Sequence, residues 1–237
     1  MKKGMIAVAS VLTLMTATSA KAEDGEKATF EVGADVVSSY IWRGQDCAGF
    51  SVQPGVTYTW RKPGISVGAW ASAELFENSR FANMNEFDLS VSWTPVDALS
   101  VGVTDYHFCG GNYWRDWDFS AGASHNLELN VSYDFGPVSL AWNTCLTGPD
   151  HHANGDRCYS TYVEAKAPFT LCGVECEAAV GVTPLDDHFT VADGQENFKV
   201  VNVSCQASKD IKGIPFFGRV VFNPRSEATY FVVGLSF

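Results

Sequence analysis

Positive charge is scarce in this sequence. Sixteen Lys and Arg residues stand against 27 Asp and Glu residues, which gives a formal net charge of −11. A chain with this balance repels nucleic-acid phosphates and anionic headgroups, so no nucleic-acid partner is expected. The chain after Met15 also lacks any run of about eighteen apolar residues, which excludes a transmembrane helix there. The fold must therefore come from other patterns.

The first residues have the pattern of an export signal. Lys2 and Lys3 precede an apolar run from Gly4 to Met15, and Ala20-Lys21-Ala22 has the small-x-small form of a cleavage site. We expect a signal peptide over residues 1–22 and a mature chain over residues 23–237, exported to the periplasm. Without the three leader lysines, 13 basic residues remain against 27 acidic ones, a net charge of −14.

Apolar and polar residues alternate along most of the mature chain. In the segment Phe50–Trp60, one face of an extended strand carries only Phe, Val, Pro, Tyr and Trp, and the other carries Ser, Gln, Gly and Thr. Eleven further segments repeat this period, from about Ala28–Arg43 to the C-terminus. Each has about the ten residues that a tilted strand needs to cross a bilayer. Twelve is an even number, as closed bacterial barrels require.

The polar faces of these segments carry too many charges for the core of a soluble protein. The acidic residues on them are Glu31, Asp35, Glu74, Glu86, Asp88, Glu128, Glu164, Glu175 and Glu177. The apolar faces therefore point outward into lipid, and the acidic faces line a lumen. We predict an all-β fold, a twelve-stranded antiparallel up-and-down transmembrane β-barrel.

Aromatic residues and connection lengths agree with this orientation. Aromatic residues gather at the two ends of the apolar faces, as at two membrane interfaces: Trp60, Trp93, Tyr133 and Phe237 at one end, and Trp42, Phe50, Phe87, Trp142 and Tyr159 at the other. Tight turns rich in Gly and Pro alternate with longer connections, which is typical of periplasmic turns and extracellular loops.

The chain resembles bacterial outer-membrane β-barrels in its leader, its alternating segments and its last residues, Tyr230–Phe237. The terminal Phe237 is similar to the signal read by the barrel-assembly machinery in that class. The resemblance implies the cell outer membrane as location, with outer-membrane lipid and that machinery as partners. A narrower resemblance rests on Val36–Gly44 and Ser100–Tyr106, which are similar to strands of the TorF-type porins. It implies passive permeation without a defined substrate.

The charges on the predicted lumen suggest a function. An acidic lining favours cations, and Arg43, Lys166 and Arg219 would face the acids across the lumen and shape a constriction. The sequence predicts a porin-like channel for passive diffusion of small solutes, favouring cationic or neutral ones. Twelve strands lie between filled eight-stranded barrels and open porins, so a self-paired, closed interior is an alternative. Another is a non-conducting barrel that binds ligands or surfaces through its extracellular loops.

Two loop features are candidates for ligand contact. Tyr113, Trp114, Arg115 and Trp117 could bind a sugar, or their loop could fold inward as a plug, although loops of this kind more commonly pack on their own aromatic residues and the barrel rim. The acidic and histidine clusters at residues 150–156 and 186–188 contain metal-ligand types without the spacing of zinc or calcium sites. We expect no metal and no cofactor.

An outer-membrane enzyme acting on lipid is the rival class. It would need a Ser–His pair, oriented by a third polar group, on the lipid-facing rim. His107 alternates in step with the lipid-facing side chains of its strand, so it has the parity of that face. No serine stands out as its partner, however, and no nucleophile-elbow motif occurs. We therefore expect no enzymatic activity.

The sequence contains seven cysteines. Export permits disulfides, and Cys145 and Cys158 bracket one predicted loop, which makes them the best-placed pair. The odd count leaves at least one cysteine unpaired within the monomer.

Overall fold

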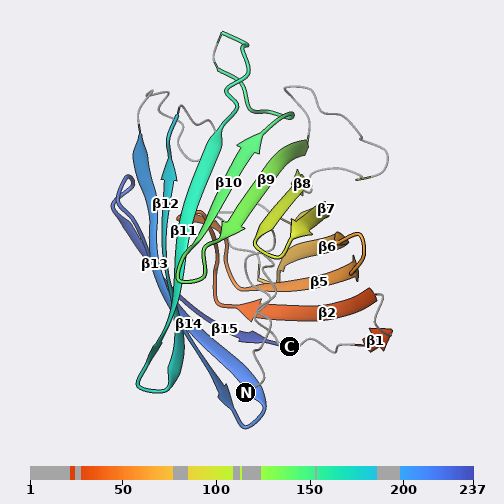
Figure 1. Cartoon of the computed structure of the whole chain (residues 1–237). Helices are drawn as coiled ribbons and strands as arrows, with labels where there is room; N and C mark the ends of the chain where they lie inside the picture. The colour runs from red at the N-terminus through yellow and green to blue at the C-terminus, as the bar shows by residue number, and fades with distance from the viewer. Residues whose placement is uncertain are drawn as a thin grey trace.

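The computed structural model describes residues 22–24, 28–76, 85–108, 113, 124–152, 154–185 and 198–237. Residues 1–21 of the predicted leader lie outside these ranges. The described chain forms a closed antiparallel barrel of twelve strands (Figure 1). Among the described residues, no helix is long and apolar enough to cross a membrane.

The barrel strands follow one another around the wall in chain order, and β2 closes the ring by pairing with both β5 and β15. They are β2 (Ala28–Val37), β5 (Ser51–Trp60), β6 (Ile65–Glu74), β7 (Glu86–Val96), β8 (Leu99–Phe108), β9 (His125–Asp134), β10 (Ser139–Cys145), β11 (Thr161–Leu171), β12 (Val174–Thr183), β13 (Lys199–Ile211), β14 (Ile214–Asn223) and β15 (Ala228–Ser236). This is the predicted up-and-down architecture, including its number of strands.

Side-chain burial is inverted relative to a soluble protein. Apolar side chains in mid-strand are exposed on the outer surface, for example Val91 at 55% and Val220 at 43%. Buried positions inside the barrel hold polar or charged side chains such as Gln53, Glu128 and Asn130. Because side chains alternate between the two surfaces of a strand, the period of two in the sequence produces this arrangement directly.

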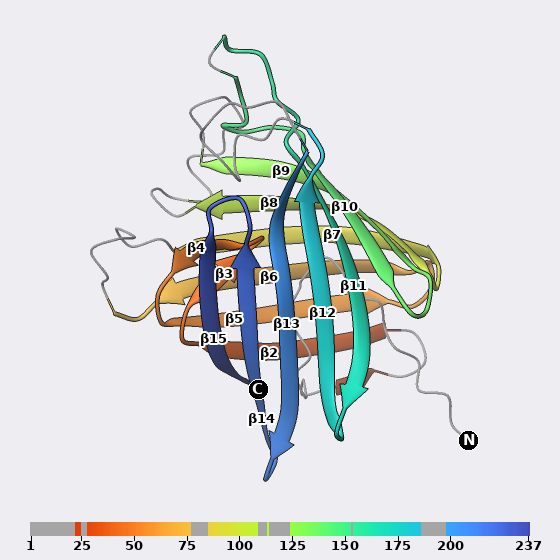
Figure 2. The same cartoon turned by 90° about the vertical axis from the view of Figure 1, so that its left-hand side faces the viewer.

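The tight turns after β5, β7, β9, β11 and β13 lie at one end of the barrel (Figures 1 and 2). The short turn of residues 224–227, between β14 and β15, lies at the other end. Two of the tight turns are two-residue hairpins, Cys172-Gly173 between β11 and β12 and Lys212-Gly213 between β13 and β14. Both residues of each pair have positive φ, between 52° and 83°. This is the type I′ geometry that matches the twist of neighbouring strands and favours glycine at its second position.

The seam between β15 and β2 is the shortest junction in the barrel. Only residues 234–236 of β15 pair with residues 35–37 of β2, whereas β2 and β5 pair over ten residues. Backbone hydrogen bonds between Ala34 and Phe237, in both directions, extend the seam slightly. The short strand β1 (Ala22–Asp24) pairs with the start of β2.

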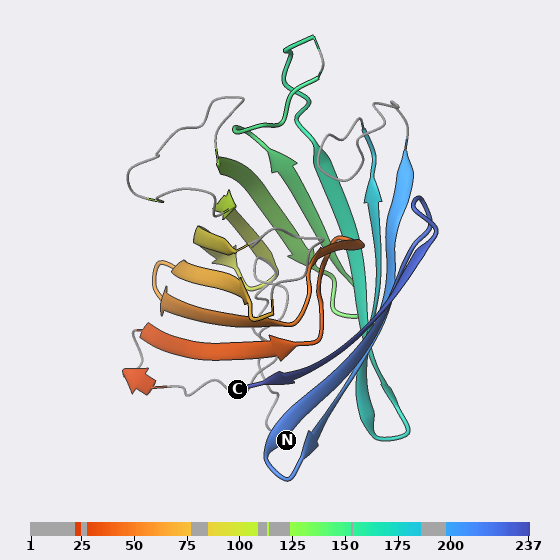
Figure 3. The same ribbon diagram turned by 180° about the vertical axis from the view of Figure 1, so that it is seen from behind.

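The structure departs from the prediction after Val37. The first strand was expected to continue to Arg43, but it ends at Val37 and the chain then forms a small hairpin, β3 (Tyr40–Trp42) and β4 (Gln45–Ala48). The hairpin extends from β2 and β5 across the barrel interior toward the opposite wall (Figure 3). Trp42 therefore does not belong to the predicted belt of aromatic residues at the membrane interface. Its ring lies 5.8 Å from that of Tyr106, a buried residue of β8.

Candidate functional site

The β3–β4 hairpin contacts many strands of the wall from inside. Its turn, Arg43-Gly44, has φ values of 50° and 80°, close to those of the tight turns at the barrel end. The Gly44 carbonyl accepts a hydrogen bond from Asn223 Nδ2 of β14 at 3.1 Å. A Cβ on Gly44 would lie 1.9 Å from the Val201 carbonyl oxygen of β13. The turn thus sits directly against β13 and β14.

One side of the hairpin packs on an apolar part of the interior. Ile41 of β3 is buried with Val37 at the end of β2, and with Phe217, Val221 and Val232 on β14 and β15. The Arg219 guanidinium of β14 donates to the Ile41 carbonyl oxygen at 3.1 Å. This part of the wall is apolar, and Ile41 of the hairpin covers it.

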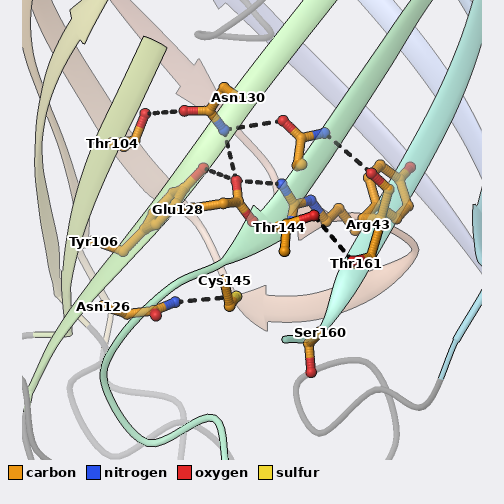
Figure 4. Close-up of polar contacts among 12 residues, drawn as sticks. Arg43, Thr104, Tyr106, Asn126, Glu128, Asn130, Thr144, Cys145, Ser160 and Thr161 are labelled. Atoms are coloured by element: carbon orange, nitrogen blue, oxygen red, sulfur yellow. Dashed lines mark hydrogen bonds and ion pairs between the residues drawn. The ribbon is translucent and has the colours of Figure 1, made fainter. Parts of the chain in front are cut away.

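The other side of the hairpin presents Arg43 to the polar wall. Its two terminal nitrogens donate to the two carboxylate oxygens of Glu128 on β9, both at 2.7 Å (Figure 4). The guanidinium carbon lies 4.3 Å from the ring centroid of Trp42 and 4.7 Å from that of Tyr162 on β11. Glu128 is 1% exposed. A bidentate, buried ion pair beside two aromatic faces is a strong, charge-assisted contact across the barrel.

Neighbouring side chains hold Glu128 in place. Tyr106 donates its hydroxyl to Glu128 Oε1 at 3.1 Å, and Asn130 Nδ2 donates to the same oxygen at 2.8 Å. Asn130 is itself fixed, because Thr104 donates to its Oδ1 at 2.8 Å and its Nδ2 also reaches Asn143 Oδ1 at 2.9 Å. The network extends over β8, β9 and β10 (Figure 4).

Arg43 is charged in this environment. Burial by itself would lower the pKa of the guanidinium, but the attraction and hydrogen bonds of the Glu128 carboxylate more than offset it and raise that pKa above its ordinary value. The hairpin therefore carries a permanent positive charge into the middle of an acidic interior.

The remaining lumen candidates fall into two groups. Lys166 on β11 lies 3.3 Å from Glu164 and 3.7 Å from Glu177, and Glu164 also accepts from Asn202 Nδ2 at 3.0 Å. The members of the second group form no ion pair within 4 Å among the described residues. Its members are Glu31, Asp35, Glu74, Glu86, Asp88, Glu175 and Arg219. The interior is thus unevenly neutralised.

Within that second group, the acids differ in burial. Glu86 and Asp88 on β7 are buried at 6% and 7% exposure, and Asp88 Oδ1 has no hydrogen-bond partner among the residues that the structure describes. Glu74 accepts a hydrogen bond from the backbone N–H of Gly49, the residue that follows β4 of the hairpin. Glu175, near the tight-turn end, is exposed. The buried carboxyl groups of this second group are therefore Glu86 and Asp88 on β7 and Asp35 on β2.

A second polar cluster lies outside the lumen, at the loop end of β8 and β9. His125 Nδ1 lies 2.9 Å from Asp105 Oδ2, and the Tyr113 hydroxyl donates to the same oxygen at 2.7 Å. The His107 ring lies 4.5 Å from that of His125. Both histidines are fully buried, so His107 is not exposed to lipid as its parity suggested. Sequence reasoning missed the Asp105–His125 pair, although the two have the same parity on adjacent strands.

Several loop predictions are resolved only in part. Tyr113 packs edge-on against Phe87 with centroids 5.0 Å apart, while Trp114, Arg115 and Trp117 lie outside the described residues. Residues 186–188 also lie outside them. Across the described ranges, no group of three His, Cys, Asp or Glu side chains is arranged to hold a metal ion.

The predicted disulfide between Cys145 and Cys158 is not formed. Cys145 is a buried free cysteine at the end of β10, and its sulfur accepts a hydrogen bond from Asn126 Nδ2 at 3.5 Å. Bracketing a loop in sequence does not by itself bring two Cβ atoms to the distance and direction that a disulfide needs.

Comparison with known proteins gives a family but no relative. No curated protein matches the chain. The comparisons also give no support to the narrower resemblance to TorF-type porins. A model of one family of bacterial proteins of unknown function, Gcw_chp, matches residues 20–208, and these include β2 to β12 and most of β13. With its closed barrel of twelve strands, the chain therefore belongs to the Gcw_chp family of bacterial proteins.

Proposed function

We propose that this protein is an outer-membrane porin-like channel for passive diffusion of small solutes, favouring cationic or neutral ones. The observation that carries the proposal is the inverted burial, with apolar side chains outside and a charged, hydrogen-bonded interior. An apolar band suits lipid, and buried acids such as Glu86 and Asp88 would favour cations. The proposal includes export by the leader, assembly through Phe237 and no enzymatic activity.

The hairpin supplies the constriction of this channel. It extends into the interior and ties Arg43 to Glu128 on the opposite side. In barrels of this class, an inward-folded segment reduces the cross-section of the lumen, and solutes pass through the space that remains between this segment and the wall. We propose that the position of the hairpin sets how readily solutes pass.

A hairpin-deleted variant tests the channel directly. Val37 and Ser51 are register partners, so a two-residue Asn-Gly turn can replace residues 38–50 with type I′ geometry. The mature chain and this variant would be refolded into planar bilayers, and current recorded under a salt gradient. We expect discrete steps with cation preference, larger and more frequent in the variant.

The controls separate insertion from conduction. Heat-modifiable migration on a gel reports a folded barrel for both proteins. If both barrels fold and insert but neither conducts, the channel proposal is wrong. A non-conducting barrel that binds ligands through its loops would then be the better account.

A further inference from the structure

We propose that the Glu128 site is the solute-recognition site of the channel, and that it selects small solutes carrying a guanidinium group. Arg43 occupies this site when the hairpin is docked, and a permeating guanidinium takes its place when the hairpin leaves. This inference rests on the proposed channel function and names its substrate class.

The wall half of the site does not depend on the hairpin. Glu128 on β9 is held by Tyr106 of β8 and by Asn130 of β9. The Tyr162 ring on β11 faces the position of the Arg43 guanidinium, 4.7 Å away. If the hairpin withdrew, Arg43 and Trp42 would leave, but an oriented carboxylate and an aromatic face would remain. Together they form a preorganised receptor for a planar cation.

Charge explains why the hairpin withdraws from the Glu128 site only when a cation replaces Arg43. Glu128 is 1% exposed, and its counter-charge among the described residues is Arg43, at 2.7 Å from each oxygen. Withdrawing Arg43 alone would leave a buried carboxylate without its partner, which is strongly unfavourable. A solute that brings its own cation removes that cost. A neutral solute of the same shape does not.

Geometry selects guanidinium over other cations. Glu128 is engaged through two parallel N–H···O bonds, as its two distances show. A guanidinium reproduces this fork and also stacks on an aromatic ring. An alkali ion offers no donors, and a tetraalkylammonium offers charge and aromatic contact but no hydrogen bond. Selectivity should therefore follow the order methylguanidinium, then methylammonium, then tetramethylammonium.

The first experiment compares two probes of nearly equal shape. Single-channel current of the mature chain is recorded in potassium chloride with methylguanidinium chloride or with neutral methylurea added to both sides. We expect millimolar methylguanidinium to raise the open probability at least tenfold. Methylurea should leave it unchanged. Tetramethylammonium chloride controls for charge and ionic strength and should have little effect.

Variants place the effect at Glu128. In Glu128→Gln the response to methylguanidinium should be lost, whereas Glu177→Gln, which alters an exposed lumen acid on β12, should keep it. Arg43→Gln should be open without any probe, and methylguanidinium should then reduce its current by occupying the vacant site. If Glu128→Gln responds like the wild type, the site is elsewhere and the inference fails.

A chemical readout keeps the test decisive if Glu128→Gln does not fold. Cys47 lies on β4, and its rate of alkylation in a chain whose other cysteines are serine reports departure of the hairpin. Methylguanidinium should accelerate this reaction in the otherwise wild-type barrel, and methylurea should not. No acceleration, with a hairpin-deleted barrel that conducts, overturns the inference but leaves the channel intact. A hairpin-deleted barrel that never conducts overturns the channel itself.

Discussion

Alanine at Gly44 should undock the hairpin without altering any charge. A Cβ at this position would meet the Val201 carbonyl oxygen at 1.9 Å, whereas ordinary contacts begin at 3.4 Å. Val201 is a fully buried bulge residue of β13, and its neighbours Val200 and Asn202 are paired with β12. Its carbonyl cannot give way by that distance, so the hairpin turn must withdraw.

The size of the effect follows from the contacts that the turn would lose. The Asn223–Gly44 hydrogen bond is worth about 1 kcal/mol, and each charge-assisted bond from Arg43 to Glu128 about 1.5–3 kcal/mol. Losing the Asn223–Gly44 bond and half of the free energy of the two Arg43–Glu128 bonds amounts to about 3 kcal/mol. That corresponds to about a hundredfold shift toward the undocked hairpin.

Gly213 provides a matched control. Lys212-Gly213 is a two-residue turn with φ values of 58° and 83°, nearly those of Arg43-Gly44, but a Cβ on Gly213 would meet nothing within 4 Å. Gly213→Ala therefore introduces the same backbone strain, about 1–2 kcal/mol, without the clash. The difference between the two variants isolates the docking of the hairpin.

The assay is the alkylation rate of Cys47 in a chain whose other cysteines are replaced by serine. In the docked hairpin, burial and the nearby Glu86 raise the pKa of the Cys47 thiol to about 12, so the reactive thiolate is scarce near neutral pH. Gly44→Ala should react up to about a hundredfold faster, and Gly213→Ala like the parent. Equal, slow rates in all three would refute the docked geometry.

Three further predictions concern the outer surface, the lumen and the loop-end cluster. Val91→Arg, at an exposed mid-strand position, should cost about 2–4 kcal/mol of folding free energy in lipid vesicles, whereas Asp97→Arg in a tight turn should not; equal urea midpoints would contradict the outward orientation. Asp88→Asn removes a buried acid and should shift the reversal potential in a salt gradient toward zero; an unchanged potential would exclude Asp88 from the path. Tyr113→Phe deletes a bond to Asp105 and should lower stability by about 1.5–3 kcal/mol in urea unfolding, and no change would show that the bond contributes nothing.

The barrel was predictable because its signal is local and repeated. Period-two alternation, as in Phe50–Trp60, marks both the strand and its two surfaces, and the charge on one surface decides which is inside. The strand number and order also followed, because short turns leave neighbouring strands little choice of partner. The observed β5, Ser51–Trp60, differs from the predicted segment by one residue.

The hairpin was not predictable by the same reasoning. Tyr40 and Trp42 continue the parity of Val32 and Val36, so alternation extended the first strand through them. Parity assigns a side chain to a surface only while the strand continues, and the chain bends at residues 38–39. The Arg43-Gly44 dipeptide, a two-residue turn between two short apolar-containing segments, was the available signal. The partner Glu128 lies 85 residues away, and no local pattern indicates such a contact.

The short seam makes the barrel mechanically uneven. The shortest pairing in its wall is where residues 234–236 meet residues 35–37, with further hydrogen bonds between Ala34 and Phe237 and between Ser38 and Val233, so heat or lateral force in the membrane should part the cylinder there first. Val37 and Ile41 lie against Val232 just inside this joint, so the root of the hairpin acts as an internal brace. The hairpin that narrows the interior thus also stabilises the closed barrel. Any movement that opens the channel must leave Val37 and Ile41 in place while the Arg43-Gly44 turn departs.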